Sequence, residues 1–63
     1  MKHLLFVKNL NGPEDVEKIR EAFLDSRVEY EIILDRQCIV IFGRNDIVRA
    51  AKTLLSEAGF IVQ

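Results

Sequence analysis

The sequence contains one cysteine, one histidine, one proline, three glycines and no tryptophan in 63 residues. A single cysteine excludes an intrachain disulfide, and one cysteine with one histidine cannot complete a structural zinc site. No apolar run approaches the roughly 20 residues needed to cross a bilayer. The first residues lack the small-residue cleavage site of a signal peptide, so we expect none. These shortages predict a single soluble, cytoplasmic domain over residues 1–63.

An excess of charge of one sign is also missing. Nine Lys and Arg oppose ten Asp and Glu, which gives a formal net charge of −1. Non-specific affinity for nucleic acid comes mostly from basic side chains, so this balance disfavours a chain that works by neutralising phosphates. Hydrophobic residues make up 49% of the chain, which indicates a packed core rather than disorder. Because neither a plausible Ser-His-Asp or Cys-His set nor a glycine-rich phosphate loop is present, we expect no enzyme.

Hydrophobic periodicity predicts six elements in the order strand, helix, strand, strand, helix, strand. The expected strands are residues 4–8, 27–34, 38–42 and 60–62, with a polar turn at 35–37. The expected helices are residues 13–24 and 47–58, and Gly59 stands where a glycine commonly ends a helix. Right-handed crossovers then predict an α+β, ferredoxin-like βαββαβ two-layer sandwich. In it, two helices cover one face of a four-stranded antiparallel sheet whose first and third strands are central.

The sheet face opposite the helices is expected to carry an apolar patch. Alternation along the two central strands predicts that this face contains Leu4, Phe6, Ile39 and Ile41. The expected margins of the patch are apolar at Ile33 and Ile61 and acidic at Glu29 and Glu31. Monomers seldom expose contiguous apolar patches beyond a few hundred Å², so we expect a protein partner or a homodimer here. The alternative is that these side chains are exposed singly, as is common on protein surfaces.

The whole chain resembles the heavy-metal-associated domains of small copper chaperones and metal-ATPase N-terminal modules. Those domains read strand, Gly-Met-Thr-Cys-x-x-Cys, helix, hairpin, then a helix ending in Glu-Ala-Gly-Tyr or Glu-Ala-Gly-Phe before a short strand. This chain has the segments Phe6-Val7-Lys8-Asn9-Leu10-Asn11-Gly12-Pro13-Glu14-Asp15 and Glu57-Ala58-Gly59-Phe60-Ile61-Val62. The resemblance implies that Leu10 stands where the family's Met packs, and that Phe60 lies near the metal loop.

The chain departs from this family at the metal ligands. Gly12 and Asp15 occupy the two cysteine positions, and thiolates are what make such a site soft enough for Cu(I). These ligands do not support copper or zinc, so we expect no cofactor; Gly12 is then a turn residue, and Asp15 complements the helix dipole. Cys38 is the only soft ligand left, and we expect a small buried hydrophobe on the helix side of the sheet, or a metal contact between chains. His3 lacks a second ligand and is expected to be solvated.

A second resemblance, to RNA-recognition motifs, covers the first strand. Residues 5–10 fit the shorter consensus of that family, which implies that Phe6 stacks on a base. The longer consensus falls on residues 35–42 and fails there, because Gln37 and Ile39 replace the two exposed aromatic residues. Three hypotheses follow, in this order: a degenerate heavy-metal-associated-like domain that acts by protein–protein contact, a weak or inter-chain metal-binding role, and a single-stranded RNA binder.

Overall fold

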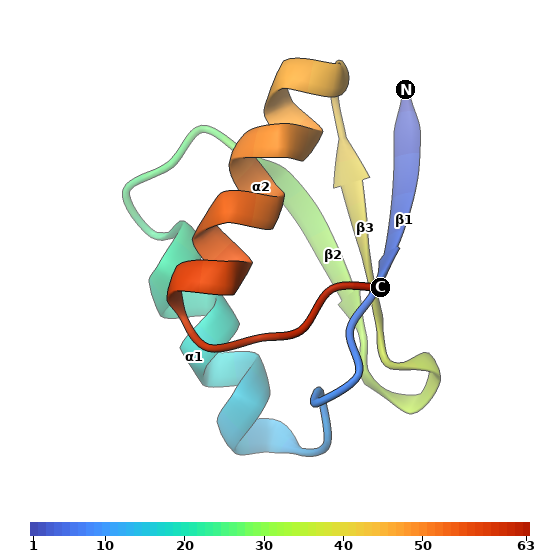
Figure 1. Ribbon diagram of the computed structural model, residues 1–63, viewed down its shortest axis with the longest axis vertical. Helices are drawn as coiled ribbons and strands as arrows, with labels where there is room; N and C mark the ends of the chain where they lie inside the picture. The colour runs from blue at the N-terminus through green and yellow to red at the C-terminus, as the bar shows by residue number, and fades with distance from the viewer.

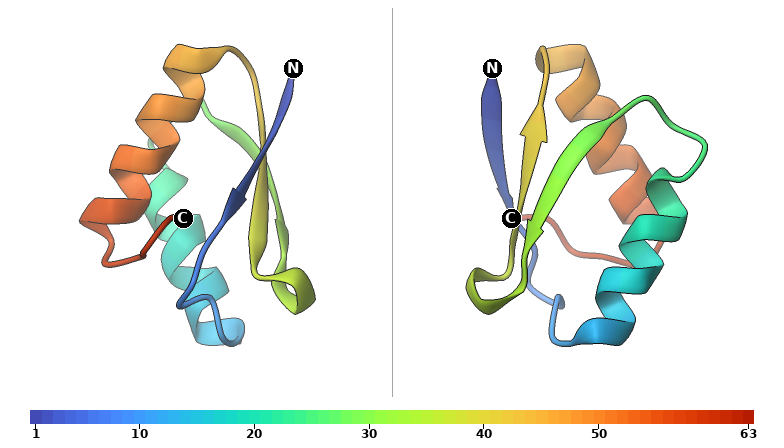
Figure 2. Two further views of the ribbon diagram at one scale, coloured as in Figure 1. Left: turned by 45° about the vertical axis from the view of Figure 1, so that its right-hand side comes forward. Right: turned by 180° about the vertical axis from the view of Figure 1, so that it is seen from behind.

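The computed structural model describes all 63 residues as an antiparallel sheet with two helices packed against one of its faces (Figures 1 and 2). The elements are β1 (Lys2–Phe6), α1 (Pro13–Phe23), β2 (Glu29–Ile33), a 3-10 turn (Leu34–Arg36), β3 (Cys38–Phe42) and α2 (Asn45–Glu57). The strand order is β1-β3-β2, so β3 is the central strand. No helix is both long enough and apolar enough to span a membrane.

Both helices begin and end close to where the sequence predicts. Pro13 takes the first position of α1, where its missing N–H costs nothing, and Glu14 and Asp15 place negative charge at the positive end of the helix dipole. Helix α2 ends in a Schellman motif. The Gly59 N–H donates to the Ser56 carbonyl at 3.0 Å and the Phe60 N–H donates to the Leu55 carbonyl at 2.9 Å. Gly59 has φ +91°, a left-handed conformation that other residues rarely adopt.

The prediction of a four-stranded sheet is wrong, because the sheet has three strands. Residues 60–62 form only an isolated bridge between Val62 and Val7. Two backbone hydrogen bonds flank this bridge, from the Lys8 N–H to the Ile61 carbonyl at 2.9 Å and from the Gln63 N–H to the Phe6 carbonyl at 2.8 Å. Before the bridge the Asn9 side chain holds the segment, since its Oδ1 accepts the Ile61 N–H at 2.9 Å and its Nδ2 donates to the Gly59 carbonyl at 3.0 Å. Pairing thus stops at one bridge, and β1 lies at the edge of the three-stranded sheet and not in its centre.

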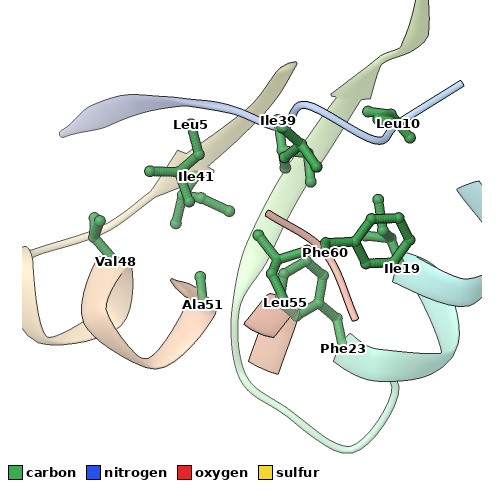
Figure 3. Close-up of a cluster of buried hydrophobic side chains, with 11 residues drawn as sticks. Leu5, Leu10, Ile19, Phe23, Ile39, Ile41, Val48, Ala51, Leu55 and Phe60 are labelled. Carbon is green, nitrogen blue, oxygen red and sulfur yellow. The ribbon is translucent and has the colours of Figure 1, made fainter. Parts of the chain in front are cut away.

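One hydrophobic core fills the space between the sheet and the helices. Side chains from β1, β3 and both helices point toward one another there (Figure 3). The cluster contains Leu5, Val7, Leu10, Ile19, Phe23, Ile39, Ile41, Val48, Ala51, Leu55 and Phe60. Leu10 and Phe60 are therefore core residues that fix the β1–α1 loop (residues 7–12) and the end of the chain to the same interior. Phe23 also packs against Tyr30 of β2, with ring centroids 4.7 Å apart.

The faces of β3 are the reverse of the prediction. Ile39 and Ile41, expected on the open side of the sheet, are fully buried in the core against the helices. Cys38, expected on the helix side, is buried outside that cluster, on the other face. Alternation shows which residues of β3 share a face. Because every residue of β3 is apolar, its sequence does not show which face packs against the helices, and the register with β1 decides this. In that register Ile39 lies opposite Leu5, and Cys38 lies opposite Phe6.

Candidate functional site

The face of the sheet without helices is a three-by-three array of side chains, because residues directly opposite one another in an antiparallel pair point to the same side. We call this array the open face. Its three rows, read from β1 across β3 to β2, are Lys2–Phe42–Glu29, Leu4–Val40–Glu31 and Phe6–Cys38–Ile33. Leu4 and Phe6 belong to it as predicted, whereas Val40, Cys38 and Phe42 take the places expected for Ile39 and Ile41.

The centre of the open face is apolar and buried without any covering layer. Cys38 and Val40 are 2% and 6% exposed, although neither belongs to the cluster beneath the helices. Their cover comes from the side chains on the neighbouring strands, among which Leu4 is 57% and Phe6 is 47% exposed. The open face therefore has an apolar floor along β3 and an exposed apolar border along β1.

The two edges of the open face differ in charge. Lys2 lies at one end of β1, while Glu29 and Glu31 lie along β2, and all three are exposed. Phe42, half-buried, separates Lys2 from Glu29 in the same row. The β1 edge is therefore positively charged and the β2 edge is negatively charged.

Ile61 extends the apolar border beyond Phe6. The bridge between Val7 and Val62 is antiparallel, so Ile61 lies opposite Lys8. Val62 packs against the core, and Ile61 therefore points to the other side and is 56% exposed. The expectation that Ile33 and Ile61 adjoin the apolar patch agrees with this arrangement.

The β1–α1 loop, where the resemblance to heavy-metal-associated domains places a metal, is held by hydrogen bonds within the molecule. The Asp15 Oδ2 accepts the Asn11 N–H at 2.9 Å. Gly12 precedes the helix with φ −165°, an extended backbone that any residue adopts. This geometry agrees with the structural interpretation of both residues, a turn before the helix and a carboxylate at its first turn.

Gln37 joins the same loop to the β2–β3 turn. Its Nε2 lies within 3.2 Å of the Lys8 carbonyl and within 3.1 Å of the Leu10 carbonyl and the Asn11 Oδ1. Its backbone is left-handed, at φ 51°, and its carbonyl accepts the Val7 N–H at 2.8 Å. Sequence reasoning missed both Gln37 and Asn9 as organising residues. The available signal was a polar side chain beside a turn, which occurs in most loops and does not identify a partner.

The remaining candidate ligands lie apart. Cys38 lies on the open face, on the opposite side of the sheet from α1, the helix that carries Asp15. His3 is half-buried on the helix side, opposite Ile41, and its Nε2 is buried without a hydrogen-bond partner, so the expectation that it is solvated is wrong. The structure brings together no group of three His, Cys, Asp or Glu side chains that could hold a metal ion.

Phe6 is the residue that the RNA-recognition resemblance singles out. It is exposed on the open face, as base stacking requires. Its neighbour on β3 is Cys38. The other aromatic side chain of the array is Phe42, two rows away. A platform of adjacent aromatic side chains is therefore not formed.

The chain matches no protein-family model, no curated protein and no solved structure.

Proposed function

We propose that this chain is a non-enzymatic, cytoplasmic protein-interaction domain that binds an apolar surface of a protein partner, a different protein or a second copy of the chain, through its open face. The observation that carries the proposal is the exposure of Leu4 and Phe6 beside the buried Val40 and Cys38. Leu4 and Phe6 are exposed side by side along β1, next to the apolar floor of β3, and exposed apolar patches on a small domain mark interaction sites. Water excluded from this patch on binding supplies the main favourable term.

A protein partner fits the open face better than RNA does. Glu29 and Glu31 line one edge, and acidic side chains repel phosphates. Binding of single-stranded nucleic acid combines a basic groove with several stacked bases. Within the array Lys2 is the only basic side chain, and Lys8 is the one basic residue beside Ile61 at its border. Phe6 has no adjacent aromatic partner in the array.

The proposal treats the chain as similar to a heavy-metal-associated domain that does not use a metal loop. Its support is the position of Leu10 and Phe60 in the core beside that loop. The Asp15 carboxylate is already bonded to the Asn11 N–H, and Cys38 lies on the other face of the sheet. The largest surface depression, between α2 and residues 60–63, contains one ionisable side chain, Lys52.

Site-specific photo-crosslinking in the cells that express the protein tests this proposal. A benzophenone amino acid replaces Phe6 in one variant and Leu24 in a matched control. Leu24 is also a large apolar residue, 78% exposed, but it lies at the end of α1 and away from the sheet. We expect discrete protein adducts from position 6 and none of the same mass from position 24, with mass spectrometry to identify them. No adduct from position 6, the same adducts from both positions, or adducts removed by nuclease would contradict the proposal.

A further inference from the structure

We infer that the occupant of the open face is a second copy of this chain, held in a two-fold sandwich in which Lys2 of each copy faces Glu29 of the partner subunit. The inference rests on the proposed function and names its partner. It follows from the array of side chains on the open face and from the symmetry of an association between like chains. Such associations most commonly have a two-fold axis, which places one surface against itself.

Two orientations of a two-fold axis bring the open face against itself with its strands aligned. In the first, the axis runs parallel to the strands, so β3 lies over β3 and β1 of each copy lies over β2 of the other. Each row then meets itself in reverse order. Lys2 faces Glu29 of the partner subunit, and Phe6 faces Ile33 of the partner subunit. Opposite charges therefore meet at both edges of the first row, whereas in the middle row Leu4 faces Glu31 of the partner subunit. Apolar side chains meet along β3 and in the third row.

In the second orientation, the axis runs across the strands, so each strand lies over its own copy and the rows exchange ends. Glu31 then faces Glu31 of the partner subunit, Lys2 faces Phe6 and Glu29 faces Ile33. Like charges are brought together at Glu31, and Lys2 and Glu29 are both placed against apolar side chains, whereas the first orientation places only Glu31 against one. Unpaired charges are unfavourable in a desolvated interface. The charges on the open face thus favour the first orientation over the second.

The interface is small, and the dimer is accordingly weak. The open face consists of three strands of five residues, each about 17 Å long and about 4.8 Å from its neighbour. The area of this face is less than the roughly 800 Å² that each partner buries in a standard interface. We expect a dissociation constant on the order of 10⁻⁵ to 10⁻³ M. Packed sheets are about 10 Å apart, beyond the roughly 7 Å between Cα atoms that a disulfide allows, so Cys38 does not crosslink the dimer.

Two charge-reversal variants test the orientation. In Lys2→Glu, residue 2 faces Glu29 of the partner subunit with the same charge, and in Glu29→Lys two lysines face each other. Each variant alone should dimerise about tenfold more weakly than the wild type in low salt. Mixed together, they should form a heterodimer, since both edges then hold one acidic and one basic residue. Sedimentation across concentration measures the homodimers, and native mass spectrometry measures the heterodimer. Lys52→Glu, an exposed change on α2, is the matched control and should dimerise like the wild type.

The outcomes separate this inference from the proposed function. A wild-type chain that stays monomeric at millimolar concentration overturns the homodimer, and photo-crosslinks from position 6 to a different protein would then leave the proposed function standing. A dimer whose strength does not change in either charge variant, or variants that fail to associate on mixing, overturns the two-fold arrangement. A homodimer confirmed in solution without any adduct from position 6 in cells would instead contradict the proposed function.

Discussion

The β1–α1 loop and the open face differ in how completely their side chains find partners within the molecule. In the loop, Asn9 bonds to the segment after α2, Gln37 bonds to three acceptors, and the Asp15 carboxylate bonds to a backbone N–H. On the open face, Leu4 and Phe6 stay exposed beside an apolar floor that no helix covers.

This difference separates a region whose polar groups are paired within the molecule from one whose apolar side chains stay exposed. Polar groups that are already paired gain little from a ligand, since each new bond replaces an existing one. Exposed apolar side chains have the opposite property, because any surface that covers them removes apolar area from water. The polar groups of the loop are therefore already paired within the fold, and the open face is the surface that the proposed function assigns to a partner.

The strongest test of this comparison places thiolates in the loop. Gly12 and Asp15 lie one helical turn apart, with the Asp15 N–H 3.0 Å from the Gly12 carbonyl, and a Cβ at Gly12 meets no atom within 4 Å. The variant Gly12→Cys with Asp15→Cys should bind Cu(I) several orders of magnitude more tightly than the wild type, because two soft ligands replace one hard oxygen. Competition with a chelator measures the affinity, and Gly12→Cys alone is the control. If the double variant bound Cu(I) no more tightly than the wild type, the loop would not have the shape of a metal loop, and the resemblance to heavy-metal-associated domains would lose its support.

Replacing a leucine by alanine in each region compares the two directly, and the loss of stability in the loop is the next largest expected effect. Leu10→Ala in the loop should lower the free energy of unfolding by about 3 kcal/mol, because Leu10 is fully buried and its loss leaves a cavity. Leu4→Ala on the open face should lower it by about 0.5 kcal/mol, since surface changes away from special features are usually small. Urea denaturation measures both. Similar losses at the two positions would mean that the open face contributes to the stability of the monomer as much as the loop does.

The sequence predicts the helices and β3 well and the arrangement of the sheet poorly. Helical spacing after Pro13 and the glycine at position 59 are local signals, and both elements end near the expected residues. The faces of β3 depend on a register between segments more than 30 residues apart, which alternation within one strand does not contain. Residues 60–62 pair through one bridge only, and that bridge and the bonds of Asn9 to residues 59 and 61 follow from the tertiary fold. For the same reason, the open face was predicted with Leu4 and Phe6 but without Val40.

Removing the bonds of Asn9 should have a smaller effect. We expect Asn9→Ala to lower the free energy of unfolding by about 1–2 kcal/mol, because the Ile61 N–H and the Gly59 carbonyl both lose a partner. Asn45→Ala, at an exposed position where no side-chain cap is formed, is the control and should change stability much less. Thermal and urea unfolding monitored by circular dichroism measure the difference. Equal stability in the two variants would show that the core and the backbone hydrogen bonds to Phe6 and Lys8 hold residues 59–63 without the Asn9 side chain.

A gain in stability is expected at a buried polar atom that, unlike the polar atoms of the loop, has no hydrogen-bond partner. His3 Nε2 is buried with no hydrogen bond, and such a group costs about 1–3 kcal/mol. His3→Leu should raise the free energy of unfolding by about 1 kcal/mol, since His3 lies on the helix side opposite Ile41. His3→Gln, which keeps a polar group, is the control and should bring no gain. Loss of stability in His3→Leu would indicate that the imidazole has a partner in solution.

The bonds of Asn9 also bear on how fast the protein folds and unfolds. They join residues 50 and 52 positions apart in the chain, whereas the bonds of the helices join residues three or four positions apart. Closing a long loop costs more entropy than closing a short one, so distant contacts tend to form late. We therefore expect the segment after α2 to dock after the transition state, and loss of Asn9 to speed unfolding while the folding rate stays the same. The lifetime of the folded state, rather than the time needed to reach it, then depends on this one side chain.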